Sequence, residues 1–408
     1  MARVSSLFIG ARGTGPAAAV RAGIALLLCL AASQQARAQN GTAAGNPPAA
    51  TPAETPAAAE PKADPAPEAG IISFFKNTEL GGLADVYYDY YSTKPSGDAP
   101  FRNFDTKHNQ FGFSMAELWV AKAPTSDQRG GFKVKFTVGP AATLIHASEP
   151  GTTAIFQNIE EGFVSYLAPI GKGLQFDAGK FATQHGAEVI EAKDNWNYSR
   201  SLLFALAIPY YHSGVRATYA PNGKVTVMAD IVNGWNDVTD NNARKTFGVQ
   251  VAIKPTPALS IVQNYMAGPE QPHDNADWRH LADTVVTFTA SPKLSLMANY
   301  DYGSDTIAGI RGHWQGVAGY ARFQPSKYVA FSPRVEWYHD AAGFTTGTAQ
   351  TLKEVTTTME LRGTESFLWR IEYRGDFSDV AVFTAPAGPT RRQQSIGFGV
   401  LYWFSTKG

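Results

Sequence analysis

The strongest constraint on this chain is an alternation of apolar and polar residues with a period of two, which recurs from about residue 80 to the end. Segment 366–376 is the clearest case. Its apolar row is Phe367, Trp369, Ile371 and Tyr373, and its other row contains Arg370, Glu372 and Arg374. A β-strand with two unlike faces has this period, whereas a helix repeats about every 3.6 residues. The alternation therefore predicts an all-β protein.

Connection lengths distinguish a barrel from a soluble sandwich. We predict sixteen strands, at 80–91, 110–122, 131–138, 156–168, 173–181, 212–220, 223–232, 245–254, 258–266, 279–290, 293–302, 313–323, 327–339, 351–362, 366–376 and 393–404. Seven short turns alternate strictly with eight long polar connections, as expected of an antiparallel up-and-down β-barrel that spans a membrane. Two of these segments, 258–266 and 313–323, alternate poorly, so fourteen or eighteen strands remain alternatives.

The cost of charge in lipid decides which face points outward. An arginine facing hydrocarbon near the membrane midplane costs about 2–4 kcal/mol, so the aromatic rows should face lipid and the charged rows a polar lumen. At sixteen strands that lumen is wide enough for water. The candidate pore-wall residues on the lumen rows are Lys133, Lys135, Arg216, Arg334, Glu336, Arg362, Arg370, Glu372 and Arg374. Glu336, Glu354, Glu360 and Glu372 share these rows, so cross-strand ion pairing that only neutralises the ladder is the structural alternative.

The N-terminal region has the features of an export signal. Arg3, Arg12 and Arg21 precede the apolar run 24–32, and Ala36 and Ala38 supply the small residues that a signal peptidase requires. We therefore expect a signal peptide at 1–38, an Ala/Pro-rich disordered periplasmic spacer at 39–70, and the barrel at 71–408. The chain has 35 basic and 35 acidic residues, so its net charge favours no nucleic-acid partner.

The third long connection, from about residue 182 to 211, is the longest predicted loop. Its charged residues include Glu188, Glu191, Lys193, Asp194 and Arg200, and the apolar run 202–209 follows them. This run is too apolar to lie in water. It needs cover from the barrel interior or from a neighbouring subunit.

Several motifs resemble those of a known family. They are the first-strand segment Leu83–Tyr88, the run Gly179–Thr183, the triplet Gly186–Glu188, the segment Asn195–Ser201 and the closing strand Gly399–Phe404. Together they resemble bacterial outer-membrane porins, in particular the OmpL-like β-barrel porins. The sequence departs from that group at Gln184-His185, where proline is frequent, and at Ser405–Gly408, which follow the usual last aromatic residue.

The resemblance implies a passive outer-membrane channel for small hydrophilic solutes or ions. It implies that the third loop folds inward and narrows the pore, with Glu188, Glu191 and Asp194 near the constriction. It also implies that the last strand is recognised by the barrel insertion machinery. By analogy with sixteen-stranded porins it suggests a homotrimer, although the chain has no obvious association motif.

Enzymatic signals are few. The eight histidines have no metal-ligand spacing, and no G-x-S-x-G, H-E-x-x-H or P-loop motif is present. The only cysteine, Cys29, falls within the predicted signal peptide. We predict no enzyme activity, no cofactor and no metal, and we interpret the loop 233–242, with Asp237 and Asp240, as solvated rather than calcium-binding. An adhesion or structural barrel and a barrel hydrolase with a Ser/His pair are the alternatives.

Overall fold

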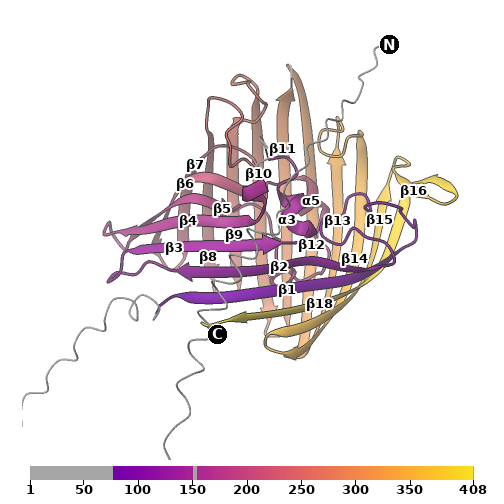
Figure 1. Ribbon diagram of the computed structural model, residues 1–408, viewed down its shortest axis with the longest axis horizontal. Coiled ribbons are helices and arrows are strands. Elements are labelled where there is room, and N and C mark those ends of the chain that lie inside the picture. Colours follow the sequence, from indigo (N-terminus) through magenta and orange to yellow (C-terminus); the bar gives the residue numbers. More distant parts are fainter. Residues whose placement is uncertain (1–76, 150–153, 308, 408) are drawn as a thin grey trace, which may run out of the picture. The chain divides into compact units, whose positions relative to one another are not determined.

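The computed structural model describes residues 77–149, 154–307 and 309–407. In this part of the chain, sixteen antiparallel strands form a closed barrel (Figure 1). Consecutive barrel strands pair with each other, and the first and last strands close the wall from Gly81↔Ser405 to Tyr91↔Ser395. The predicted barrel and its strand number are confirmed. The predictions for 1–38 and 39–70 lie outside the described residues.

The bounds of the elements follow the predicted segments closely. The barrel strands are β1 (Glu79–Tyr91), β2 (Phe111–Lys122), β3 (Gly130–Val138), β4 (Ile159–Ala168), β5 (Leu174–Ala182), β6 (Tyr211–Asn222), β7 (Val225–Val232), β8 (Thr246–Thr256), β9 (Leu259–Pro269), β10 (Trp278–Ser291), β11 (Leu294–Ile307), β12 (Ile310–Ser326), β13 (Val329–Asp340), β14 (Gln350–Thr364), β15 (Phe367–Ser378) and β18 (Arg392–Ser405). The connections contain α3 (Pro140–Ile145), α4 (Ala154–Gln157), the short 3-10 helix η2 (Ala192–Asp194), α5 (Leu202–Leu206) and the hairpin of β16 (Phe383–Ala385) and β17 (Gly388–Thr390). None of the described helices is long and apolar enough to span a membrane.

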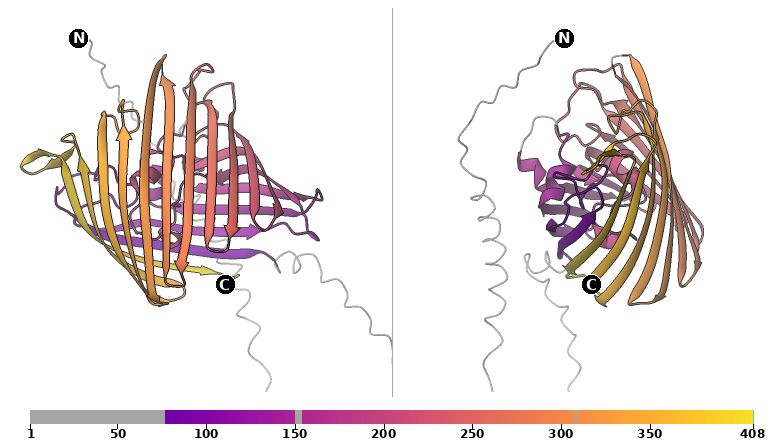
Figure 2. Two further views of the ribbon diagram at one scale, coloured as in Figure 1. Left: turned by 180° about the vertical axis from the view of Figure 1, so that it is seen from behind. Right: turned by 90° about the vertical axis from the view of Figure 1, so that its right-hand side faces the viewer.

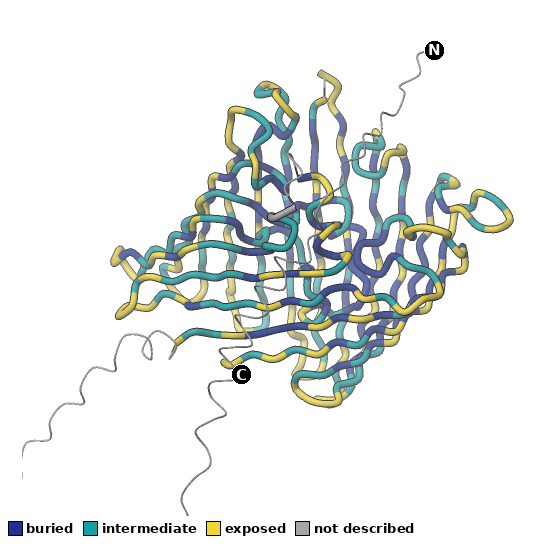
Figure 3. Tube along the Cα trace, viewed as in Figure 1, coloured by how far each residue is buried: buried dark blue, intermediate teal, exposed yellow. Residues whose placement is uncertain are grey.

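The two faces of the strands differ as the alternation predicts. Ile371 and Tyr373 on β15 are exposed on the outer surface, whereas Arg370, Glu372 and Arg374, which alternate with them, are buried. The same alternation of exposed and buried positions runs along the strands around the barrel (Figure 3). The outer surface is therefore rich in Val, Ile, Phe and Tyr, as a wall that meets lipid requires.

One predicted loop is wrong. The sequence analysis places a long polar connection at 303–312, but β11 and β12 remain paired through Gly303↔Trp314 and Ser304↔His313 to Ile307↔Ile310. Asp305 on this extension binds Arg279 of β10, so polar side chains stabilise the pairing there. There are two smaller differences. Helix α4 occupies residues that we assigned to the start of the fourth strand, and the last long connection contains the β16–β17 hairpin.

The connection 183–210 between β5 and β6 is the longest one between barrel strands in the described part of the chain. It turns into the barrel, and its helix α5 lies against β12 and β13 (Figures 1 and 2). We call this connection the third loop. It positions the candidate site, because it meets the inward faces of strands from several parts of the wall.

Candidate pore constriction

The third loop is attached to the wall through its backbone amides. Tyr198 and Ser199 donate their N–H groups to the Glu372 carboxylate at 2.7 and 3.0 Å. Leu202 and Leu203, at the start of α5, donate theirs to Glu336 at 3.0 and 3.3 Å. Backbone N–H groups that leave water must be paired. The inward glutamates of β13 and β15 therefore supply acceptors that the loop itself lacks.

The wall arginines bind the same loop through its carbonyl groups. Arg334 donates to the Ser199 carbonyl at 2.7 Å, and Arg374 donates to the Arg200 carbonyl at 2.6 Å. Arg370 donates to the carbonyls of Ala192, Asn195 and Asn197. The wall thus supplies acceptors for N–H groups of the loop and donors for its carbonyl groups. These hydrogen bonds fix the position of the loop on β13–β15.

These wall charges also pair with one another. Arg334 lies 3.1 Å from Glu354 and 3.3 Å from Glu336. Arg370 lies 2.7 Å from Glu360, and Arg374 lies 2.8 Å from Asp376. All of these side chains are buried. Buried ion pairs are stable only when their members also have hydrogen-bond partners, and the loop supplies partners for Arg334, Arg370 and Arg374 here. We call the inward faces of β13, β14 and β15 the docked wall.

The apolar run of the loop is covered by the chain itself. Leu202, Leu203, Phe204 and Ile208 are buried in the main apolar cluster, which includes Trp314 of β12. Trp314 also donates its indole N–H to the Ala207 carbonyl. Burial of this run removes the need for cover by a neighbouring subunit.

Close approach of the loop to the last strand depends on a glycine. The Tyr198 ring packs on the inward face of β18 at Gly399, where a Cβ would lie 2.5 Å from a ring carbon. The Tyr198 hydroxyl then donates to Asp85 of β1 at 2.8 Å. This contact explains why glycine occupies position 399 on the inward row of β18.

The structure places the predicted loop residues in different surroundings. Glu188 is buried and paired with Arg334 at 2.8 Å, and Arg200 is buried with its guanidinium on loop carbonyls. Glu191 contacts Lys135 of β3. Lys193 and Asp194 pair with each other at 2.6 Å, and the Asp194 side chain is 55% exposed. Among the five predicted loop residues, Asp194 thus presents the most charge to water.

The predicted wall residues fall into two groups, one buried under the third loop and one partly exposed to the lumen. Arg334, Glu336, Arg370, Glu372 and Arg374 belong to the docked wall and are buried under the loop. Lys133 pairs with Glu161, Arg216 with Asp177, and Arg362 with Glu360, and in each pair the basic side chain is the more exposed one. Water in the lumen therefore meets these three cations more than their acidic partners.

A pocket of about 210 Å³ lies against β5 to β8. It is lined by Gln175, Asp177, Gln184, Arg216, Thr218, Met228 and Gln250. We call the inward faces of these four strands the pocket wall. Arg216 binds Asp177 at 2.9 Å and lies over the Phe181 ring at 4.4 Å, so its position is fixed while its side chain stays 23% exposed.

His185 and Asp237 are among the loop groups outside the spanning strands whose pKa values are shifted. Burial lowers the pKa of His185, at one of the positions that depart from the OmpL-like pattern, to about 4. Burial beside Glu270 and Glu149 raises the pKa of Asp237 to about 8. His185 is therefore neutral at neutral pH. The prediction that the loop around Asp237 is merely solvated is wrong for this residue, which is buried.

Glu354 and Glu360 lie on the inward rows where ion pairing was the alternative, and each binds an arginine. Two further acidic partners, Asp177 and Asp376, were not predicted, although they also lie on inward rows and each binds an arginine. A list of all acids on those rows would have found them. Arg102, in the first long connection, has no such signal, yet it binds Asp376 at 2.9 Å.

A closed sixteen-stranded barrel with a long loop docked inside is the arrangement of a porin. The family model described as "Putative beta-barrel porin-2, OmpL-like" matches residues 77–404, and the chain belongs to this family. A search of curated proteins finds no match in sequence.

Solved structures share the fold at low sequence identity. The anion-selective porin from Comamonas acidovorans has a TM-score of 0.56 at 11% identity, covering 80% of this chain and 99% of that one. Outer-membrane expressed OmpT of Vibrio cholerae has a TM-score of 0.55 at 12% identity, covering 80% and 97%. The outer-membrane channel DcaP of Acinetobacter baumannii has a TM-score of 0.53 at 12% identity, with the same coverage. These likenesses show the fold.

Proposed function

We propose that this protein is a passive outer-membrane channel for small hydrophilic solutes or ions, and that its third loop narrows the pore. The observation that carries the proposal is the docking of residues 186–203 inside the barrel, through hydrogen bonds to Glu336, Glu372, Arg334 and Arg370. A loop held at so many points reduces the cross-section open to solutes. Family membership supports the channel class.

The proposed constriction has a definite set of residues. Glu188 and Arg200 hold the loop together, while Glu191, Lys193 and Asp194 form its tip. Lys133, Arg216 and Arg362 are the wall cations that face the remaining lumen. In a narrow passage, opposed charges of this kind act on solutes more strongly than in bulk water.

Single-channel recording in a planar bilayer tests the proposal. Deletion of Glu188–Arg200 should raise the conductance, because the segment that occupies the lumen is lost. Shortening the β11–β12 hairpin around the exposed Ile307 and Ile310 is the control and should leave the conductance unchanged. Equal conductance in the loop deletion and the wild type would contradict the constriction, and a silent wild-type protein would contradict the channel.

The topology and membrane insertion follow from the same barrel. We propose that both ends of the barrel and its short turns face the periplasm, while the long connections face outward. The last strand, β18, presents Ile396, Phe398, Tyr402 and Phe404 on its exposed face, which suits recognition by the insertion machinery. Protease added to intact cells should cut within 233–245. Preferential cutting at Gly223-Lys224 would reverse the topology.

We further propose a homotrimer, on the ground that OmpT of Vibrio cholerae has been solved in a trimer form. Light scattering of the protein in detergent should give the mass of three chains. A hydrolase is the less supported function, because the histidine side chains in the described residues hydrogen-bond to Thr, Tyr, Lys or backbone groups rather than to serine. Lipid hydrolysis by the purified barrel would restore that alternative.

A further inference from the structure

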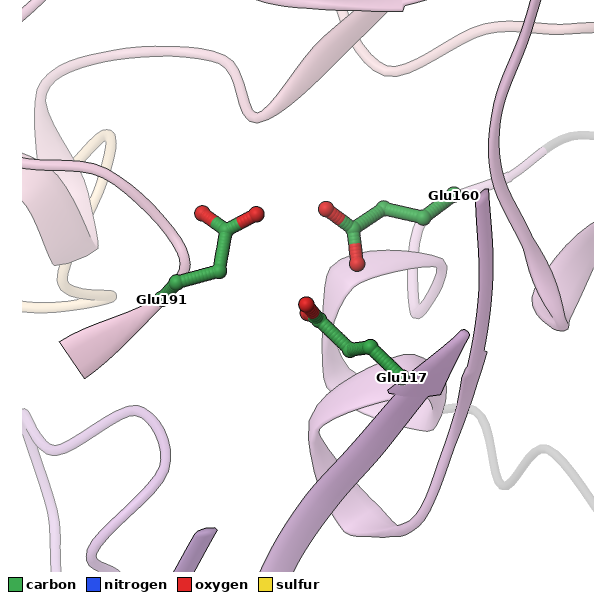
Figure 4. A group of neighbouring side chains, drawn as sticks. All are labelled: Glu117, Glu160 and Glu191. Atoms are coloured by element: carbon green, nitrogen blue, oxygen red, sulfur yellow. The ribbon is translucent and has the colours of Figure 1, made fainter. Parts of the chain in front are cut away.

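Three glutamates meet where the third loop touches the wall on the side of β2 to β4. Glu117 belongs to β2, Glu160 to β4, and Glu191 to the loop immediately before η2. One carboxylate oxygen from each lies within 4.8 Å of the other two. The three side chains point toward one another (Figure 4). We call them the glutamate trio.

The positive charge near the trio does not balance it. The Lys135 ammonium lies 2.7 Å from Glu160 and 3.7 Å from Glu117, and it contacts Glu191. Among the described residues it is the only basic side chain paired with any of the three. Glu161 next to them is paired with Lys133. Lys193 also acts on Glu117, but it is paired with Asp194, so the three carboxylates beside Lys135 keep a surplus of negative charge. The site is largely removed from water, where unpaired charge is costly.

Glu117 is the member of the trio whose surroundings best suit a bound cation. Its side chain is 0% exposed, and both of its carboxylate oxygens lack a hydrogen-bond donor. Glu160, by contrast, accepts from Lys135 and from the Thr137 hydroxyl. Buried carboxylates normally collect hydrogen bonds. A carboxylate that collects none and is directed at two others is suited to a cation.

We propose that Glu117, Glu160 and Glu191 bind one divalent cation, calcium by its preference for carboxylate oxygens in irregular geometry. Calcium binds oxygen at about 2.3–2.6 Å, so oxygens up to roughly 4.8 Å apart can share one ion. Two positive charges offset the surplus of the site. Lys135 then turns toward Glu161, which already lies 3.9 Å from its ammonium.

This site reaches beyond the channel function because it joins two parts of the chain. Glu117 and Glu160 are fixed in the wall, and Glu191 belongs to the tip of the third loop. A bound ion therefore ties the loop tip to β2 and β4, on a different side from the docked wall. The sequence offers no spacing for such a site, since its members become neighbours only when the barrel closes.

Calcium titration of the refolded full-length chain in detergent tests the site, with bound ⁴⁵Ca²⁺ measured by equilibrium dialysis. We expect one saturable ion per chain. Glu117→Gln should weaken binding by about tenfold or more, the scale on which losses around metal sites are felt. Asp177→Asn is the matched control, because it removes a buried acid of the pocket wall, and it should leave calcium binding unchanged.

A second variant keeps the proposal testable if Glu117→Gln does not fold. Lys135→Met removes the competing ammonium, so it should tighten calcium binding, whereas a purely structural Lys135 predicts no such gain. The proposal is overturned if the wild type shows no saturable binding, if Glu117→Gln binds as the wild type does, or if Asp177→Asn loses as much as Glu117→Gln. Conductance is not needed for any of these readouts, so they are independent of the proposed channel.

Discussion

The docked wall and the pocket wall use the same kinds of inward charges in opposite ways. On the docked wall, the Arg334 side chain is 0% exposed and binds Glu188 and Glu354. On the pocket wall, Arg216 has one acidic partner and remains partly exposed. Strand alternation directs both arginines inward. The difference comes from the third loop, which covers one wall and leaves the other beside a pocket, so inward position alone does not define a pore residue.

The largest expected difference between the two walls is in stability. Arg334→Met leaves Glu188, Glu336 and Glu354 without their shared partner and should cost about 3–5 kcal/mol, as breaking a buried ion pair does. Arg216→Met should cost less than about 1 kcal/mol, since the pair is partly exposed and Asp177 keeps hydrogen bonds from Ser165 and Gln175. Urea unfolding in detergent measures both. Equal losses would remove the distinction between the walls.

The outer faces of the same walls should behave alike. Ile371 on β15 and Ile231 on β7 are both exposed outward, so Ile371→Arg and Ile231→Arg should each cost about 2–4 kcal/mol in a membrane if they lie near its midplane. Valine at either position is the control and should have little effect. Refolding into lipid vesicles followed by heat denaturation gives the comparison. Wild-type stability for both arginine variants would contradict the assignment of lipid-facing rows.

A smaller effect is expected on ion selectivity. Arg216→Gln removes a cation that faces lumen water, so the reversal potential across a KCl gradient should move toward cation preference. Arg374→Gln removes a buried cation with an acidic partner and should leave the reversal potential nearly unchanged. The contrast should be greatest at about 0.01 M salt, where the Debye length is roughly 30 Å. A larger shift for Arg374→Gln would show that the docked wall faces the current.

The last prediction concerns pH and the loop that follows β7 of the pocket wall. The folded pKa of Asp237 is about 8, above its ordinary value of 3.8, so the folded protein holds a proton there that the unfolded chain has lost. That stabilisation is present at low pH and declines as the pH rises from about 4 to 8. The stability of Asp237→Asn relative to the wild type should therefore be greater at pH 8 than at pH 5. Parallel melting curves at both pH values would contradict the raised pKa.

The sequence predicts the strands well because lipid imposes a strict rule on each outward position. Ile371 and Tyr373 alternate with Arg370 and Arg374 for that reason, and the bounds of β15 follow. This rule no longer applies where a strand extends beyond the membrane. The extension of β11 and β12 to Ile307 and Ile310 was missed because polar residues on both faces are tolerated in water.

The candidate site was less predictable, because its contacts join residues that are far apart in sequence. Periodicity places Arg334 and Glu372 on inward rows, but it cannot show that Ser199 and Tyr198 bind them. The inward fold of the third loop was implied by the resemblance to porins, whereas its apolar run alone left either the barrel interior or a neighbouring subunit as its cover. Which of its charges are buried depends on the docked wall, which exists only after the strands have assembled.

The pairing of β1 with β18 has a consequence for how the protein must be made. The register from Gly81↔Ser405 to Tyr91↔Ser395 joins residues from opposite ends of the barrel sequence. Until the last strand has been added, β1 and β15 each have one unpaired edge, and unpaired edges invite association with other chains. Contacts of such long sequence separation also form slowly. The unfinished sheet therefore requires protection before β18 pairs, and a chain that ends before β18 should persist as an open, aggregation-prone sheet.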